Sequence, residues 1–184
     1  MDFAHTGLKN GEKCIYITTT DSPEAVKNKM KVSGFDITGH EKDIAFIDCY
    51  SWRTNKAPEG YGIKTITDLT GLNVQVKKAA EALKLKKGRV IIDSISDFMM
   101  YADEKSVFKL LQMLVGEIKE YKSVGLMILE QGIHSEQQVS TIQYLADGVI
   151  VMDIGEKNRR MRVQKMTGTE HSLEWATFTI KQGI

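Results

Sequence analysis

The chain alternates short apolar runs, rich in isoleucine and valine, with longer segments in which apolar residues recur at helical spacing. The run at residues 89–95 is apolar on both faces, which is typical of a parallel strand covered by helices on both sides. The alternation predicts a doubly wound α/β sheet of mostly parallel strands. The predicted strands are residues 14–19, 44–50, 89–95, 125–130 and 148–154.

The pattern changes after residue 154. Residues 161–166 and 176–181 alternate apolar and polar side chains, and no helical segment separates them. This pattern predicts an antiparallel finish at one edge of the sheet. With 184 residues, no internal repeat and no low-complexity stretch, we expect one domain over residues 1–184.

Several helix starts can be predicted from local signals. Ser22 followed by Pro23 is typical of a helix N-cap and first turn. Asp103 is expected to cap a second helix, and Ser135 with Gln138 has the spacing of a capping box. A further helix is predicted over residues 69–86.

Composition excludes several classes of protein. The 25 basic residues nearly balance the 24 acidic ones, and no groove motif of aromatic and basic residues is present, which disfavours nucleic acid as a partner. Cys14 and Cys49 are expected to be buried thiols, and the histidines lack metal-ligand spacing, so no metal site is expected. No apolar run approaches a membrane span and residues 1–5 do not resemble a signal peptide, so a cytoplasmic location is expected.

The most specific single feature is an aspartate, Asp93, at the end of an apolar strand with the sequence RVIIDS. The carboxyl ends of strands face the ligand crevice of an open α/β sheet, and a carboxylate there can hold Mg²⁺ through water. A turn residue bonded to local backbone is the alternative, because aspartate often begins turns.

In their order along the chain, several segments are similar to those of one family. The sequence resembles the KaiC-like branch of the RecA-superfamily ATPases over nearly its whole length. The matching segments are GLKNGEKCIYI (7–17), DSPE (21–24), FIDCYS (46–51), DLT (68–70), YLADGVI (144–150) and KMTGT (165–169).

The resemblance implies a RecA-like fold and a set of nucleotide-site positions. Asp93 and Ser94 fall at the Walker B position, and Gln131 falls where the superfamily places a polar sensor. Lys165 and His171 fall in and after the family's finger segment. A plain loop start at Gln131 and a surface role for His171 remain as alternatives.

Three departures from the family pattern lower the expected activity. No Gly-x-x-x-x-Gly-Lys-Ser/Thr occurs in the 184 residues, so we expect the Walker A strand and helix to be missing. Thr20 and Asp21 replace the family's catalytic Glu-Glu pair, and a hydroxyl is a very weak base. Thr167 replaces the finger arginine, which removes a planar cation.

The expected gap between residues 125–130 and 148–154 would expose unpaired backbone, which is costly. Three repairs are possible, and we expect closure of the neighbouring strands or self-association. The two neighbouring strands could pair directly, a strand or peptide from another chain could fill the gap, or residues 1–8 could cover it.

The sequence therefore favours a pseudo-ATPase with no cofactor, acting as a regulatory or assembly protein. Its expected partner is a second copy of itself or an active ATPase of the same family. The alternative is an ATP- and Mg²⁺-binding enzyme whose site is completed by a partner chain.

Overall fold

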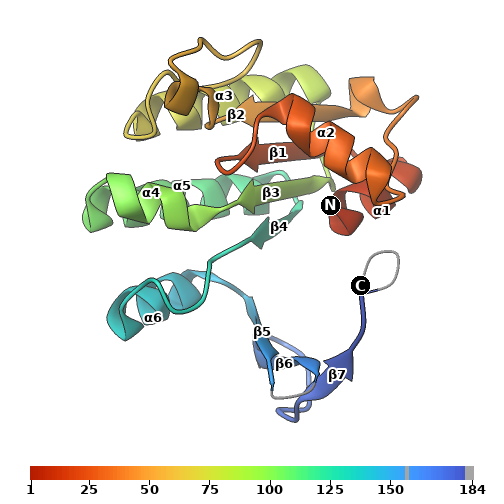
Figure 1. Ribbon diagram of the computed structural model, residues 1–184, viewed down its shortest axis with the longest axis vertical. Coiled ribbons are helices and arrows are strands. Elements are labelled where there is room, and N and C mark those ends of the chain that lie inside the picture. Colours follow the sequence, from red (N-terminus) through yellow and green to blue (C-terminus); the bar gives the residue numbers. More distant parts are fainter. Residues whose placement is uncertain (156–157, 181–184) are drawn as a thin grey trace. The chain divides into compact units, whose positions relative to one another are not determined.

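The computed structural model describes residues 1–155 and 158–180, in two compact units (Figure 1). Unit 1 is Met1–His134 and unit 2 begins at Ser135. Unit 1 contains α1 (Asp2–Lys9), β1 (Cys14–Thr18), α2 (Pro23–Val32), η1 (Glu41–Asp43), β2 (Ile44–Asp48), η2 (Ser51–Thr54), α3 (Leu69–Leu83), β3 (Arg89–Asp93), α4 (Ile95–Tyr101), α5 (Glu104–Glu120) and β4 (Val124–Met127). Unit 2 contains α6 (Glu136–Leu145), β5 (Gly148–Ile154), β6 (Arg159–Met166) and β7 (Ala176–Phe178).

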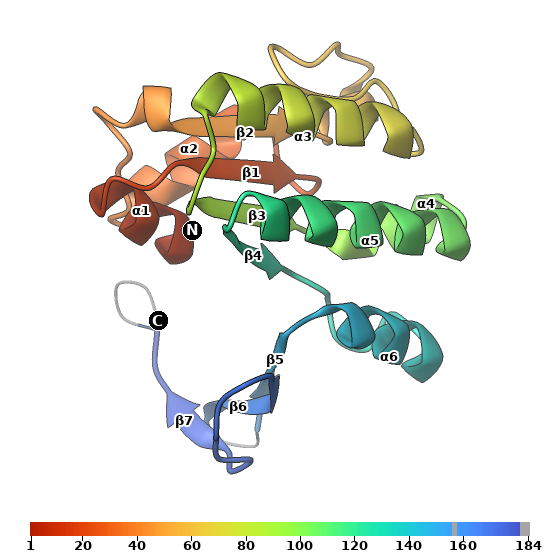
Figure 2. The ribbon, with the colours of Figure 1, turned by 180° about the vertical axis from the view of Figure 1, so that it is seen from behind.

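The core of unit 1 is a four-stranded parallel sheet in the order β2-β1-β3-β4. Helices α1 and α2 cover one face, and α3 and α5 cover the other (Figures 1 and 2). All five residues of β1 are buried, because the strand is central and both of its faces carry helices. The predicted α/β sheet is confirmed.

The helix starts follow from the local signals in the sequence. The Ser22 side chain accepts a hydrogen bond from the Ala25 amide, and Asp103 accepts one from the Ser106 amide. The capping box of Ser135 and Gln138 is present in both directions. These side chains satisfy amides that have no partner inside the helix, which confirms three predicted starts.

The outer edge of β4 is the place where the sequence predicts a gap in the sheet. β4 pairs only with β3 among the described residues, and β5 belongs to a different sheet. Because β4 belongs to unit 1 and β5 to unit 2, direct pairing of residues 125–130 with 148–154 stays a prediction. Residues 2–9 form helix α1 and pack on β1 and β3, so they add no strand to the sheet.

Unit 2 is built on an antiparallel sheet in the order β5-β6-β7. The antiparallel finish is confirmed, but β5 joins it instead of the parallel sheet. Arg160 forms an ion pair of 2.6 Å with Asp153 across the β5–β6 pair. The guanidinium groups of Arg160 and Arg162 lie 4.5 and 4.8 Å from the centre of the Trp175 ring. Of the last predicted strand, Lys181 lies outside the described residues.

Candidate functional site

The carboxyl edge of the parallel sheet in unit 1 brings together the residues that the sequence singled out on β1 and β3. Parallel strands end at the same edge, so the turn after β1 and the turn after β3 are neighbours. The register pairs Thr18 with Asp93. The Thr19 amide donates to the backbone carbonyl of Asp93 at 2.8 Å, which extends the β1–β3 ladder by one residue.

Asp93 is half-buried at the last position of β3. Its Oδ2 accepts a hydrogen bond of 2.6 Å from the hydroxyl of Tyr16, a fully buried residue of β1. The two side chains lie on one face because Tyr16 pairs with Ile91, two residues before Asp93. Burial, and then the hydrogen bond to Asp93, raises the pKa of Tyr16 well above its ordinary value, so the tyrosine is the donor at neutral pH.

Ser94 is buried immediately after Asp93. Its amide donates to Thr19 Oγ1 at 2.8 Å, and Thr19 Oγ1 in turn lies 3.3 Å from the Ser94 carbonyl. The Ser94 hydroxyl itself has no partner among the described residues. An orphaned hydroxyl beside a half-buried carboxylate is an available oxygen ligand or donor at this edge.

The two positions that correspond to the family's catalytic glutamate pair carry threonine and aspartate, Thr20 and Asp21. Thr20 is exposed, and Asp21 is half-buried. Oδ2 of Asp21 accepts a hydrogen bond from the Lys29 ammonium of α2 at 2.6 Å. The backbone carbonyl of Asp21 accepts a bond of 2.7 Å from the Thr18 hydroxyl. The turn is therefore held from both its side chain and its backbone.

The segment after β4 adds a second group at the same edge. Ser96 Oγ accepts from the Glu130 amide at 3.0 Å and lies 2.8 Å from Nε2 of His134. One carboxylate oxygen of Glu130, Oε2, is buried and has no partner in the described part of the chain. Gln131, which falls with Glu130 at the superfamily's sensor position, is exposed in the following turn.

The remaining candidate residues lie in unit 2. The Lys165 ammonium donates to the backbone carbonyls of Gln143 at 3.2 Å and Ala146 at 2.6 Å, at the end of α6. Thr167 is exposed, and its amide donates to the carbonyl of Asp147. His171 is exposed, and its Nδ1 lies 3.3 Å from the Thr169 carbonyl. Lys165, Thr167 and His171 therefore belong to unit 2, whereas Asp21, Asp93 and Gln131 belong to unit 1.

Sequence reasoning missed Tyr16, Thr19, Ser96 and His134 as members of this edge. Tyr16 gave no signal because its contact with Asp93 depends on the register of two strands that are 77 residues apart. No group of three or more histidine, cysteine, aspartate or glutamate side chains suited to a metal ion occurs within residues 1–155 and 158–180. Across the same residues, no helix combines the length and the apolar character needed to cross a bilayer.

The four-stranded parallel sheet with its antiparallel companion matches a RecA-like α/β fold. The family model described as the KaiC ATPase matches residues 1–184, and the chain belongs to this family.

Curated relatives and a solved structure agree with this assignment. The UPF0273 protein of Thermotoga maritima is 28% identical, in an alignment that covers 98% of this chain and 77% of the relative. The circadian clock protein KaiC3 of Synechocystis is 27% identical over 99% of this chain and 37% of its own length. The crystal structure of a KaiC-like protein from Pyrococcus horikoshii matches with a TM-score of 0.76 at 22% identity, covering 98% of this chain and 78% of the other.

Proposed function

We propose that this chain is a KaiC-like ATPase domain whose own residues do not hydrolyse ATP and that acts as a regulatory or assembly protein. Its partner would be a second copy or an active ATPase of the same family. The observation that carries the proposal is the engagement of both acidic side chains, Asp93 by the Tyr16 hydroxyl and Asp21 by the Lys29 ammonium.

Hydrolysis requires a base that accepts a proton from the attacking water. Oδ2 of Asp21 already accepts from the Lys29 ammonium, which leaves the other carboxylate oxygen to accept a proton from water. The neighbouring Thr20 offers only a hydroxyl, which is a very weak base at neutral pH. Loss of a general base lowers the rate by roughly 10²–10⁴-fold.

A cation that stabilises the transferred phosphate is the second requirement. Thr167 is uncharged, and the nearby Lys165 ammonium is bound to the carbonyls at the end of α6. A cation of this kind contributes roughly 10³–10⁵-fold to phosphoryl transfer. The two deficits together support a scaffold that keeps the fold and loses the reaction.

A second candidate function is favoured by the orphaned oxygens at the carboxyl edge. Ser94 Oγ, which follows Asp93 in the chain, and Glu130 Oε2, in the segment after β4, are buried without partners among the described residues. Asp93 and Ser94 would hold Mg²⁺ through water, and the metal would neutralise charge on the phosphates of ATP. Two oxygens fill only part of the octahedral shell, so a partner chain would supply the phosphate-binding loop and complete the site.

Calorimetric titration of Mg-ATP separates the two candidates. The chain, Asp93→Asn and a control Asp36→Asn are titrated under the same conditions, since Asp36 is exposed on the loop that precedes η1 and β2. We expect no heat up to millimolar nucleotide for all three proteins. Binding that is lost only in Asp93→Asn would overturn the pseudo-ATPase proposal and support the second candidate.

The partner role needs its own readout. Hydrolysis by an active family member is measured alone and after addition of this chain. A change in that rate, or a complex that sedimentation detects, supports regulation or assembly. A monomer that neither binds the active enzyme nor alters its rate would contradict the proposed role.

A further inference from the structure

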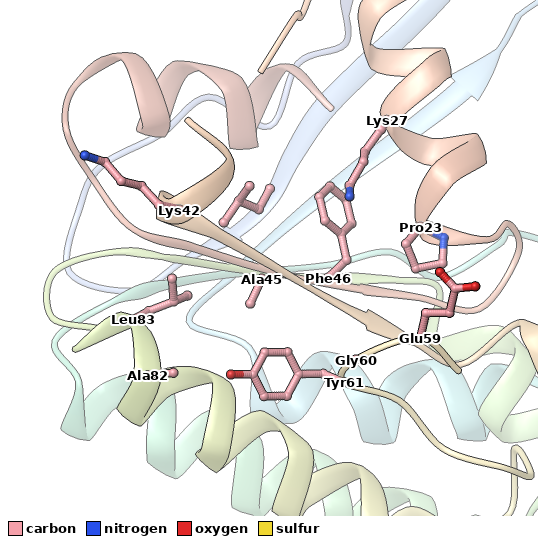
Figure 3. A pocket seen from close by; sticks show the side chains of 11 residues that line it. Pro23, Lys27, Lys42, Ala45, Phe46, Glu59, Gly60, Tyr61, Ala82 and Leu83 are labelled. Atoms are coloured by element: carbon pink, nitrogen blue, oxygen red, sulfur yellow. The ribbon is translucent and has the colours of Figure 1, made fainter. Parts of the chain in front are cut away.

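The outer edge of β2 borders a hollow of about 370 Å³ (Figure 3). Pro23 and Lys27 of α2 lie on one side of β2, and Ala82 and Leu83 of α3 lie on the other. Residues 59–61 form the end of the hollow, with the Tyr61 ring facing into it. This hollow lies wholly within unit 1 and is separate from the residues at the carboxyl edge.

The backbone of β2 presents free hydrogen-bonding groups to this hollow. The Cys49 amide donates to Thr18 of β1, whereas the preceding Asp48 amide points outward and donates to the carbonyl of Tyr61 at 2.9 Å. Successive residues of a strand alternate in direction, so Phe46 faces outward as Asp48 does. Neither backbone group of Phe46 has a partner among the described residues beyond this edge.

One residue pair already extends the sheet beyond β2. Asp48 and Gly62 form a parallel bridge, in which the backbone carbonyl of Asp48 accepts a hydrogen bond of 3.0 Å from the Ile63 amide. The added segment ends there, and the ladder positions at Phe46 and Ile44 stay open. An unpaired edge of this kind is a template for one more strand.

The side chains around the open edge favour an acidic occupant. Lys27 and Lys42 are exposed, and Glu59 is the only acidic residue among the 11 that line the hollow. The Lys27 ammonium lies 5.1 Å from the centre of the Phe46 ring, which places a positive charge beside the side chain at the open ladder position. Phe46, Tyr61 and Leu83 are half-buried and offer apolar contacts between the charges.

We propose that the β2 edge at Ile44 and Phe46 binds an extended, acidic peptide segment of a protein partner by adding a strand to the sheet. Backbone bonds to Phe46 would hold the segment, and acidic side chains would pair with Lys27 and Lys42. Alternate side chains of the segment would face α2 and α3. The inference rests on the proposed function for the existence of a protein partner and names the surface that the partner uses.

The test uses a fluorescein-labelled seven-residue peptide that alternates glutamate with valine, and a control peptide that alternates lysine with valine. Fluorescence anisotropy measures affinity, and residue-resolved amide exchange reports on Phe46. We expect the acidic peptide to bind and to slow exchange of the Phe46 amide by about tenfold or more at saturation. The lysine peptide should do neither.

Charge reversal supplies the matched comparison. Lys27→Glu with Lys42→Glu should weaken binding of the acidic peptide by about tenfold, since each substitution replaces an exposed ion pair with a like-charge repulsion. Lys105→Glu with Lys109→Glu, on exposed positions of α5, should leave it unchanged. Circular dichroism confirms that both variants fold, and the amide readout on the unaltered chain does not depend on them.

Three results would overturn the proposal. They are no binding at millimolar peptide, binding without protection of Phe46, and protection that rises with protein concentration in the absence of peptide. The last would show that a second copy occupies the edge. None of them alters the nucleotide titration, so failure of this inference is distinguishable from failure of the pseudo-ATPase proposal.

Discussion

The hydroxyl of Tyr16 donates a 2.6 Å hydrogen bond to Oδ2 of Asp93 from a neighbouring strand of the same sheet. The tyrosine ring is fully buried and lies 5.7 Å from the ring of Phe46. A buried donor that meets a carboxylate stabilises the fold, and it occupies one of the two oxygens of Asp93. The contact therefore both stabilises the sheet and fixes the position of the Asp93 side chain at its carboxyl edge.

Replacement of Tyr16 by phenylalanine removes only the hydroxyl. We expect Tyr16→Phe to lower the free energy of unfolding by about 2 kcal/mol, because Asp93 loses a charge-assisted hydrogen bond while the ring still fills the core. Urea unfolding monitored by circular dichroism measures the change. Tyr50→Phe is the control, since that half-buried hydroxyl makes no hydrogen bond in the part of the chain that the structure describes. Equal stability of the two variants would show that the bond contributes little.

The buried thiols predict a loss of stability at alkaline pH. Burial raises the pKa of the Cys14 thiol to about 12 from its ordinary value of 9.0, and burial also raises the pKa of Cys49. Above about pH 9 the unfolded chain loses these protons while the folded chain keeps them. The free energy of unfolding should then fall by about 1.4 kcal/mol per pH unit for each thiol.

Urea midpoints between about pH 8 and pH 11 test this dependence. Tyr16 adds to the loss above about pH 10, because its pKa is also raised. The double variant Cys14→Ala with Cys49→Ala should show a shallower decline than the unaltered chain over the first part of the range. Parallel declines in the two proteins would mean that other groups dominate the titration.

Local signals explain why much of the fold could be predicted from the sequence. The Ser22 cap, the Asp103 cap and the β-branched run of β3 each act within a few residues. The register of β1 with β3 could not be predicted, because strand pairing is set by contacts between distant segments. Helix α4 was also missed, since a helix of seven residues has too few turns to display helical spacing.

The candidate site could be predicted only in part from the sequence. Asp93 stood out because an acidic residue directly follows an apolar run. Its partner Tyr16 depends on the β1–β3 register, and the partners of Lys165 are backbone carbonyls, which no side-chain pattern reveals. Residue types therefore indicated which side chains could take part in chemistry. The hydrogen-bond partners of those side chains could be identified only from the structure.

Gly7 illustrates a packing constraint that a glycine in a helix normally lacks. A Cβ at Gly7 would lie 2.6 Å from both Cδ and Nε of Arg89. That guanidinium cannot move freely, because it donates to Glu12 at 2.7 and 3.0 Å and to the Phe3 carbonyl at 2.6 Å. We expect Gly7→Ala to destabilise the fold by about 1–2 kcal/mol, despite the higher helix propensity of alanine.

Gly116 provides the matched glycine. It lies within α5, and a Cβ there would meet nothing within 4 Å, so Gly116→Ala should stabilise by about 0.5–1 kcal/mol. Thermal unfolding of the two variants should move in opposite directions. A stabilised Gly7→Ala would show that Arg89 can leave its contacts at little cost.

Lys165 is the residue whose role differs most between the family pattern and the structure. Its ammonium donates to the carbonyls of Gln143 and Ala146, where the carbonyls at the end of α6 lack partners within the helix. A cation at this end of a helix also interacts favourably with the helix dipole. Lys165→Met keeps the length of the side chain and removes the charge, so it should accelerate amide exchange in the last turn of α6 by about tenfold.

Gln164→Ala is the comparison, because Gln164 reaches the same Gln143 only through a 3.4 Å side-chain contact, and its loss should have little effect. Unchanged exchange in Lys165→Met would mean that these carbonyls are satisfied without the ammonium, which would leave Lys165 available for a charge in a partner or ligand.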